Sequence, residues 1–245
     1  MSGNQDIGEQ AISKAAEVGL KSQLEAAEDL DVDVRTSPQK IVGGEVESVT
    51  IEGKGLAMQD DLRTEKLQVK TGTVSIDPFQ AAFGNIELEQ TAEAQAEMTL
   101  TEADITRAFN SDYLRQKLAS IPLEINGQTT AAQPRQIQFQ LPGEGKAHLQ
   151  AAVDLVDLNE QRQVAFTAVP AIGEDGQQIV LEQVTYENDT DAENELTAAI
   201  LDSAQALLNL KNFELDGMAL KLHELQVQPG KLTISARGVV QSFPA

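Results

Sequence analysis

From Ile86 to Leu100, mostly small or apolar residues alternate with polar residues. This long alternation constrains the fold of the chain more than any other feature. A repeat of two residues is that of a β-strand, and at about 3.3 Å per residue the segment would extend roughly 50 Å. Ala, Glu and Gln also favour helices, but a helix would spread the alternation around its whole circumference. One face would carry mostly small or apolar residues: Ile86, Leu88, Gln90, Ala92, Ala94, Ala96, Met98 and Leu100. Because alanine fills little space, the pattern predicts a long strand whose inner face leaves room for a bulkier neighbour.

This strand is expected to pass directly into a helix near residues 101–119. Thr101 is a suitable N-cap residue, and Glu102 and Asp104 would place negative charge in the first turn, where it is favourable. The apolar residues that follow recur at helical spacing: Ile105, Ala108, Phe109, Leu114 and Leu118.

The N-terminal segment predicts a second helix. From Ile7 to Leu30 the apolar and small residues recur at helical spacing, with charged residues between them. The apolar face is narrow and rich in alanine, so the helix could lie close against another surface. We interpret residues 1–36 as this helix and a linker. The pattern fits either a helix that packs inside the fold or a helix that lies on a membrane surface.

The rest of the chain reads mainly as antiparallel strands. We expect a strand at Val46–Ile51 closed by Gly53 and Gly55, and a hairpin over Leu67–Ile76 that turns at Gly72. A meander of strands follows over residues 137–186, with a turn at "GEDG". A further helix is expected near residues 190–209, before a final hairpin that turns at Pro229 and Gly230. These elements predict an α+β fold, in a single domain over residues 1–245.

The composition argues against several classes of partner. The 245-residue chain has 39 Asp and Glu against 18 Lys and Arg, a formal charge of −21, so we expect no nucleic-acid partner. It has no cysteine, which removes disulfides and thiolate chemistry. The sequence shows neither a signal peptide nor a transmembrane segment, and we therefore expect a cytoplasmic protein, peripheral to a membrane at most.

Motifs for catalysis or metal binding are weak. His148 lies among polar neighbours and is expected to be solvated, and neither it nor His223 has the ligands of a metal site nearby in the sequence. The acidic run that begins at Asp29 lacks the glycine and the final glutamate of a calcium loop. The Ser-x-x-Lys spacing at Ser37 is interrupted by proline. We expect no enzyme, no catalytic residues, no metal and no cofactor.

The order of these segments resembles that of a known bacterial family. "GGEVESVTIEGKGL", "LQVKTGTVSID" and then "FGNIELEQTAEAQAEMTLTEADI" are similar to the LmeA-like phospholipid-binding family, which has many cyanobacterial and actinobacterial members. The likeness covers nearly the whole chain, more loosely in the second half. It implies a fold similar to the tubular lipid-binding proteins, in which a long, highly curved antiparallel sheet wraps a long N-terminal helix and leaves an apolar groove. Two further helices complete the expected fold.

The resemblance implies non-catalytic binding or transfer of a lipid, with phospholipid or glycolipid acyl chains in the groove between helix and sheet. The expected partners are a lipid ligand and, transiently, a membrane surface. Given the acidic exterior, we expect neutral or zwitterionic lipids to be preferred unless Lys and Arg cluster locally. The alternative is a protein-interaction or scaffold module with a self-filled core and no ligand. Candidate groove residues, each of which could instead pack a core, are Ile12, Leu20, Leu24, Phe79, Phe83, Met98, Phe109, Ile200 and Leu207.

Overall fold

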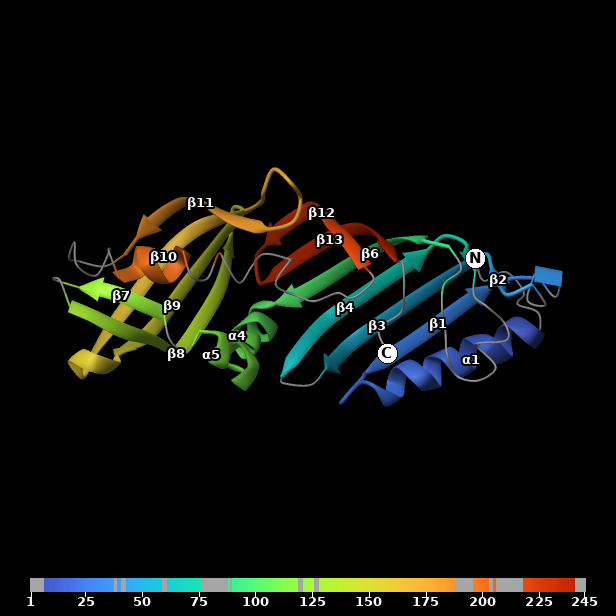
Figure 1. Cartoon of the computed structure of the whole chain (residues 1–245), viewed down its shortest axis with the longest axis horizontal. Coiled ribbons are helices and arrows are strands. Elements are labelled where there is room, and N and C mark those ends of the chain that lie inside the picture. The colour runs from blue at the N-terminus through green and yellow to red at the C-terminus, as the bar shows by residue number, and fades with distance from the viewer. Residues whose placement is uncertain are drawn as a thin grey trace.

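Two antiparallel sheets lie end to end along the length of an elongated molecule (Figure 1). The computed structural model describes residues 7–37, 39–40, 43–58, 61–75, 88, 90–118, 121–125, 128–187, 196–202, 205 and 218–240. Antiparallel sheets together with several helices confirm the α+β class.

The first sheet has six strands in the order β1-β3-β4-β6-β13-β12. Their bounds are Asp29–Arg35 (β1), Ser48–Met58 (β3), Leu62–Thr71 (β4), Ala92–Thr101 (β6), Met218–Gln228 (β12) and Lys231–Val240 (β13). The N-terminal strands therefore pair with the C-terminal hairpin through β6 at the centre. A separate pair of short strands joins β2 (Glu45–Val46) to β5 (Val74–Ser75).

The second sheet has five strands in the order β11-β10-β9-β8-β7. They are Ile121–Ile125 (β7), Gln128–Gly143 (β8), Lys146–Leu155 (β9), Glu160–Ile172 (β10) and Ile179–Tyr186 (β11), with a 3-10 turn η1 at Val156–Leu158. The strands follow one another in the chain, which confirms the expected meander and its turn at Gly173–Gly176.

In the part of the chain that the structure describes, the helices with assigned bounds are α1 (Ile7–Ser22), α4 (Glu102–Asn110) and α5 (Asp112–Lys117), which follows α4 directly. Residues 39–40, 196–202 and 205 are helical as well. The break between α4 and α5 falls at Ser111, whose hydroxyl caps α5 by accepting from the Leu114 amide. The segment 196–202 lies inside the range expected for the last helix.

The strand-to-helix transition at Thr101 is confirmed. Alternation along β6 buries Ala92 and Ala94 and exposes Glu93 and Gln95. The Thr101 hydroxyl accepts from the Asp104 amide at 3.1 Å, while the Asp104 carboxylate accepts from the Thr101 amide at 3.0 Å, which forms a capping box. The strand begins at Ala92 rather than at Ile86, and 86, 87 and 89 lie outside the described residues.

The N-terminal helix is shorter than expected. It ends at Ser22, and Asp29–Arg35, read from the sequence as helix and linker, form strand β1. In this stretch Leu30, Val32 and Val34 are buried and alternate with aspartates. That repeat of two is the signature of a strand, and pairing with β3 provides the hydrogen bonds that a helix would have made internally.

The expected hairpin around Gly72 is wrong. β4 pairs with β3 and β6, while β5 leaves the large sheet and pairs with β2. The true hairpin joins β3 to β4, because β3 does not end at Gly53 but continues through Gly55 to Met58. Gly55 has the left-handed φ of +56° that favours glycine, and the pairing skips it without a change of register. A side chain there would also collide with Glu28.

The two sheets share a core at their junction. Ile105 of α4, Leu141 of β8, Ala147 of β9 and Leu232 of β13 are buried together. The final hairpin turns at Pro229 and Gly230 as expected, and its turn bonds across the junction, where the Gly230 amide donates to the Leu141 carbonyl at 2.9 Å. Strands from both sheets and α4 thus meet around one apolar cluster.

Candidate functional site

One face of the six-stranded sheet is apolar from edge to edge. Paired residues in an antiparallel sheet project to the same face, so the register identifies complete rows across it. One row comprises Val32, Ile51, Val69, Ala96, Ala236 and Leu222. The next comprises Leu30, Gly53, Leu67, Met98, Ile234 and Leu225. We call the surface formed by these two rows the apolar face.

The opposite face of the same sheet is polar. One of its rows comprises Asp31, Glu52, Gln68, Glu97, Ser235 and Glu224. Such a separation is the usual sign of a sheet with one side in water and the other side covered. The apolar face therefore needs a covering group, and what covers it is the functional question.

Helix α1 covers one end of the apolar face. It packs against β1, where Leu30, Val32 and Val34 are only 3–4% exposed. Two hydrogen bonds fix it to this edge strand. The Val34 amide donates to the Ser13 hydroxyl at 3.0 Å, and the Thr36 amide donates to the Glu9 carboxylate at 2.8 Å. Because these bonds use backbone amides of β1 and of the residue directly after it, α1 also protects this sheet edge from pairing.

The centre of the apolar face is less covered than a normal core. Ile51, Leu67, Val69, Met98 and Ile234 are all half-buried. The second sheet provides the comparison. Its inward residues on β9 and β10 pack against Leu118 and the helical segment 196–202, and Val153 is 0% and Val164 1% exposed. The chain thus buries the inward residues of β9 and β10 almost fully and leaves the centre of the other sheet partly accessible.

Short side chains occupy the middle of the apolar face. Ala96 pairs with Ala236, and Ala94 pairs with Gly238 on the neighbouring strand. A Cβ at Gly238 would lie 2.4 Å from a methyl carbon of Leu220, so glycine is needed there for β12 to pack beside β13. These small residues, flanked by Val69, Met98 and Ile234, form a nearly flat surface. The alternation in β6 predicts such a surface.

Four of the nine candidate residues lie in this half of the molecule. Met98 is at the centre of the apolar face, and Ile12, Leu20 and Leu24 lie in or just after α1, all half-buried. Two others lie elsewhere. Phe109 stacks on Phe139 with ring centroids 6.3 Å apart, and Ile200 is 5% exposed in the core of the second sheet. The remaining three, Phe79, Phe83 and Leu207, lie outside the described residues.

Sequence reasoning missed most of the apolar face. The sequence placed Ile51 and Leu67 only at the ends of expected strands, and it did not single out Val69, Ile234 or Leu225. The alternation in each strand was the available signal. Assembling those strands into one surface requires their pairing order, which joins segments about 130 residues apart, such as Met98 and Ile234.

The histidines do not form a site with metal-binding character. His148 lies among polar neighbours on β9 of the second sheet, but its side chain is only 16% exposed. It contacts the carboxylate of Glu187 at 3.1 Å and the amide oxygen of Gln140 at 3.3 Å. His223 is exposed, with Nδ1 3.0 Å from the Ser235 carbonyl. Among the described residues, no three His, Asp or Glu side chains gather closely enough to hold a metal ion.

Comparison with known families identifies the chain's relatives. A family profile described as LmeA-like phospholipid-binding matches residues 3–237. No curated protein and no solved structure gives a significant match. Within the described ranges, every helix is too short or too polar to cross a bilayer.

Proposed function

The chain belongs to the LmeA-like phospholipid-binding family, and we propose that it binds phospholipid acyl chains against the apolar face of the six-stranded sheet. The half-buried centre of that face, in contrast to the fully buried residues of β9 and β10 in the second sheet, is the observation that supports this assignment. The binding is non-catalytic.

The energetics favour acyl chains as the covering group. Each methylene moved from water to an apolar surface contributes about 0.8 kcal/mol, so one or two chains bind without a strong polar clamp. The neighbouring half-buried residues Ala96 and Ala236 accept a straight chain because their short side chains present few obstacles. Met98 beside them has a flexible thioether side chain that adapts to an irregular partner.

In this proposal α1 forms one wall of the lipid site. Its residues Ile12 and Leu20 are half-buried, and the helix packs against β1 at the edge of the face. Leu24 continues this wall past the helix. We assign Ile200 and Phe109 to core packing, since their neighbours belong to the second sheet and the junction.

Both sheets are proposed to act as one domain. The junction core and the hydrogen bonds of Gly230 tie the C-terminal hairpin to β8 and α4, which supports a unit that moves together. A protein that holds acyl chains and has a hydrated exterior is suited to carrying lipid between membranes. Transfer with transient membrane contact is therefore our proposed role.

The experiment uses the absence of tryptophan in the chain. Met98→Trp places a single fluorophore on the apolar face, and Glu97→Trp places the same fluorophore on the polar face of the same strand. Vesicles of a phospholipid brominated on its acyl chains are then added. We expect strong quenching of the Trp at position 98 and little at position 97, because contact with brominated chains quenches the indole.

Native mass spectrometry of the unmodified protein, followed by organic extraction, provides an independent measurement. We expect bound phospholipid to be recovered. Equal quenching at the two positions together with no recovered lipid would contradict the proposal and favour the scaffold alternative, in which the chain's own side chains cover the face.

A further inference from the structure

The most buried side chains of helix α1 are polar. Among its described side chains only Glu9 and Ser13 are buried, at 8% and 7% exposed, whereas the apolar residues Ile12, Ala16 and Leu20 are half-buried. A helix that belongs to a core shows the opposite order, with its apolar residues buried most. Hydrogen bonds therefore contribute a large share of the attachment of α1.

These bonds act at one end of the helix. The Val34 amide donates to the Ser13 hydroxyl, and the Thr36 amide donates to the Glu9 carboxylate. Glu9 and Ser13 are one helical turn apart in the first half of α1, and we call the two hydrogen bonds the latch. Water replaces the lost partners when such bonds open, so their net contribution to stability is small. The latch can therefore open while the rest of the fold stays intact.

The chain beyond the other end of α1 is fixed to β3. Ala57 of β3 accepts from the Glu25 amide at 2.9 Å and donates to the Ala26 carbonyl at 2.8 Å. These bonds follow the helix in the chain and do not involve it, so they persist when α1 moves. The point of rotation therefore lies between Ser22, where the helix ends, and Glu25. Latch and point of rotation are at opposite ends of α1.

Gly19 weakens α1 without a steric reason. It is exposed, and a Cβ there would have no atom within 4 Å, so packing does not require glycine. Glycine inside a helix is less favourable than alanine. A detached helix of 16 residues is only marginally stable in water, so α1 unwinds when the latch opens. Gly19 makes this opening easier.

Helix α4 shows how this chain attaches a fixed helix. Ile105 is 7% exposed in the junction core, and the 2% exposed Asp104 is paired with Arg63 of β4. An apolar anchor and an ion pair to a buried carboxylate thus act together on α4. The described apolar residues of α1 provide no such fully buried anchor.

Release of α1 would extend the accessible part of the apolar face by one strand. Leu30 and Val32 are each 4% exposed on β1, the strand against which α1 packs, and they begin the two rows of the apolar face. We propose that α1 is a hinged lid, closed by the latch, whose opening admits a ligand to this face. The identity of that ligand rests on the proposed function, whereas the opening of α1 does not.

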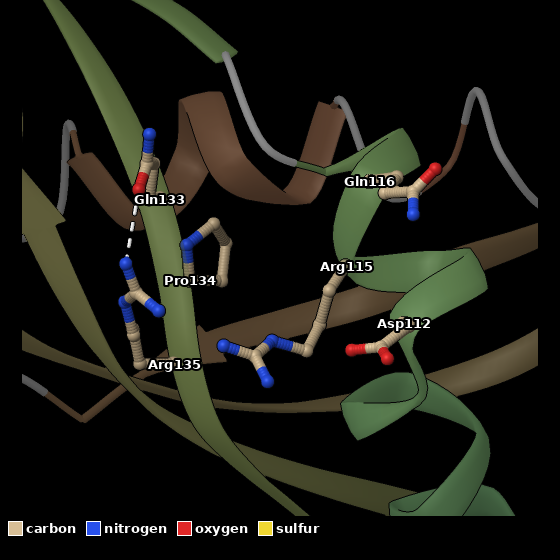
Figure 2. Close-up of a pocket in the computed structure, with 6 residues that line it drawn as sticks. All are labelled: Asp112, Arg115, Gln116, Gln133, Pro134 and Arg135. Carbon is tan, nitrogen blue, oxygen red and sulfur yellow. Dashed lines mark hydrogen bonds between the residues drawn. The ribbon is translucent and has the colours of Figure 1, made fainter.

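The hollow between α5 and β8 is separate from the apolar face (Figure 2). Its lining residues all belong to those two elements: Asp112, Arg115, Gln116, Gln133, Pro134 and Arg135. Figure 2 shows the side chains of Arg115 and Arg135 on opposite sides of the β8 ribbon. Arg135 is paired with Asp154, so the charges do not converge on a site there.

The first test is amide hydrogen exchange of the lipid-free full chain, resolved by residue with NMR. The Val34 and Thr36 amides donate to the latch, whereas the Asp33 amide points to the other edge of β1 and pairs with β3. After correction for intrinsic rates, we expect the latch amides to exchange about tenfold faster than Asp33 or more. Equal rates would overturn the inference, because α1 would then leave only when β1 separates from β3.

Two substitutions should move the exchange of Thr36 in opposite directions. Gly19→Ala favours the helix and should slow this exchange about fivefold. Ser13→Ala leaves the Val34 amide buried without its acceptor, which outweighs the better helix propensity of alanine. It should speed the exchange of Thr36 about threefold or more, although Thr36 keeps its own acceptor. Exchange of Thr36 that is unchanged in both variants overturns the lid.

Gly72→Ala is the matched control. Gly72 is also exposed, its backbone is not left-handed, and the nearest atom to a Cβ there would be 3.9 Å away. It lies outside α1, so exchange of Thr36 should stay within about twofold of the unmodified protein. A slowing equal to that in Gly19→Ala would overturn the inference, because the effect would then not come from the helix.

The second test measures access to the apolar face. Met98→Trp is mixed with vesicles of the brominated phospholipid, and the rate of quenching is followed by stopped flow. Adding Gly19→Ala should lower the rate about fivefold, and adding Ser13→Ala should raise it. Equal rates in all three proteins overturn the gating role of α1. Absence of quenching in all three, with the expected hydrogen exchange, would contradict the acyl-chain site and support the opening of α1.

Discussion

The guanidinium of Arg63 on β4 donates to the carboxylate of Asp104 on α4 at 2.8 Å, and Asp104 is only 2% exposed. Two more contacts hold Arg63, to Glu28 at 2.9 Å and to Glu65 at 3.2 Å. The pair therefore attaches the first turn of α4 to the six-stranded sheet. Since α4 also contributes Ile105 and Phe109 to the junction core, this ion pair helps fix the two sheets relative to each other.

Arg63→Ala should lower the free energy of unfolding by about 2 kcal/mol, because it leaves the Asp104 carboxylate buried without its cation. The partial exposure of Arg63 reduces the effect below that of a fully buried pair. Arg162→Ala is the control, since its pair with Glu160 is about half exposed and should contribute less than about 1 kcal/mol. Urea unfolding followed by circular dichroism measures both, and equal losses in the two variants would show that burial does not matter here.

The stability of the protein should depend on pH through Asp104. Burial opposes its ionisation, but hydrogen bonds from the Thr101 hydroxyl and amide and from Arg63 outweigh burial and hold the pKa of Asp104 below its ordinary value of 3.8. A carboxyl group with a lowered folded-state pKa contributes stability above its unfolded pKa and loses it as the pH falls through the folded pKa. This contribution should therefore be complete at pH 6 and decrease below about pH 4.

Asp104→Asn isolates that contribution. The difference in unfolding free energy between the unmodified protein and the variant should be largest at neutral pH and become smaller below about pH 4. Urea titrations at a series of pH values measure it. A difference that stays constant from pH 7 to pH 3 would mean that the Asp104 carboxylate gains nothing from its ionised contacts.

The two sheets should respond differently to loss of side-chain volume. Val153→Ala, in the closely packed second sheet, should cost about 2 kcal/mol because it leaves a cavity. Val69→Ala, on the half-buried apolar face, should cost less than about 1 kcal/mol in the lipid-free protein. Thermal unfolding of protein stripped of lipid tests this contrast. A similar loss at both positions would indicate that the apolar face is packed as tightly as the other core.

Patterns within a single segment were predicted well from the sequence. The alternation in β6, the capping box of Thr101 and Asp104 and the turn at Pro229 and Gly230 depend on residues within a few positions of each other. Their physical causes, the period of a strand and the hydrogen bonds of a helix end, are local. The error at Asp29–Arg35 arose because a helical repeat was extended past Ser22 into a segment whose own repeat was two.

Pairing between segments could not be predicted in this way. Leu67 and Val74 on either side of Gly72 read as a hairpin, yet β4 pairs with β3 and β6 and β5 with β2. Alternation shows which residues share a face of their own strand but not which strand lies beside it. The choice depends on the burial and hydrogen bonding of the whole sheet.

The sequence by itself determined the α+β class, the excess of acidic residues and the small inward residues of β6, since each of these follows from composition or from short-range order, and the family followed from a resemblance over nearly the whole chain. Only the tertiary structure decided that Met98 lies between Leu67 and Ile234 on a half-buried face, and that Arg63 of β4 pairs with Asp104 of α4. These arrangements join residues that are distant in the chain, and only folding of the complete sheet brings them together.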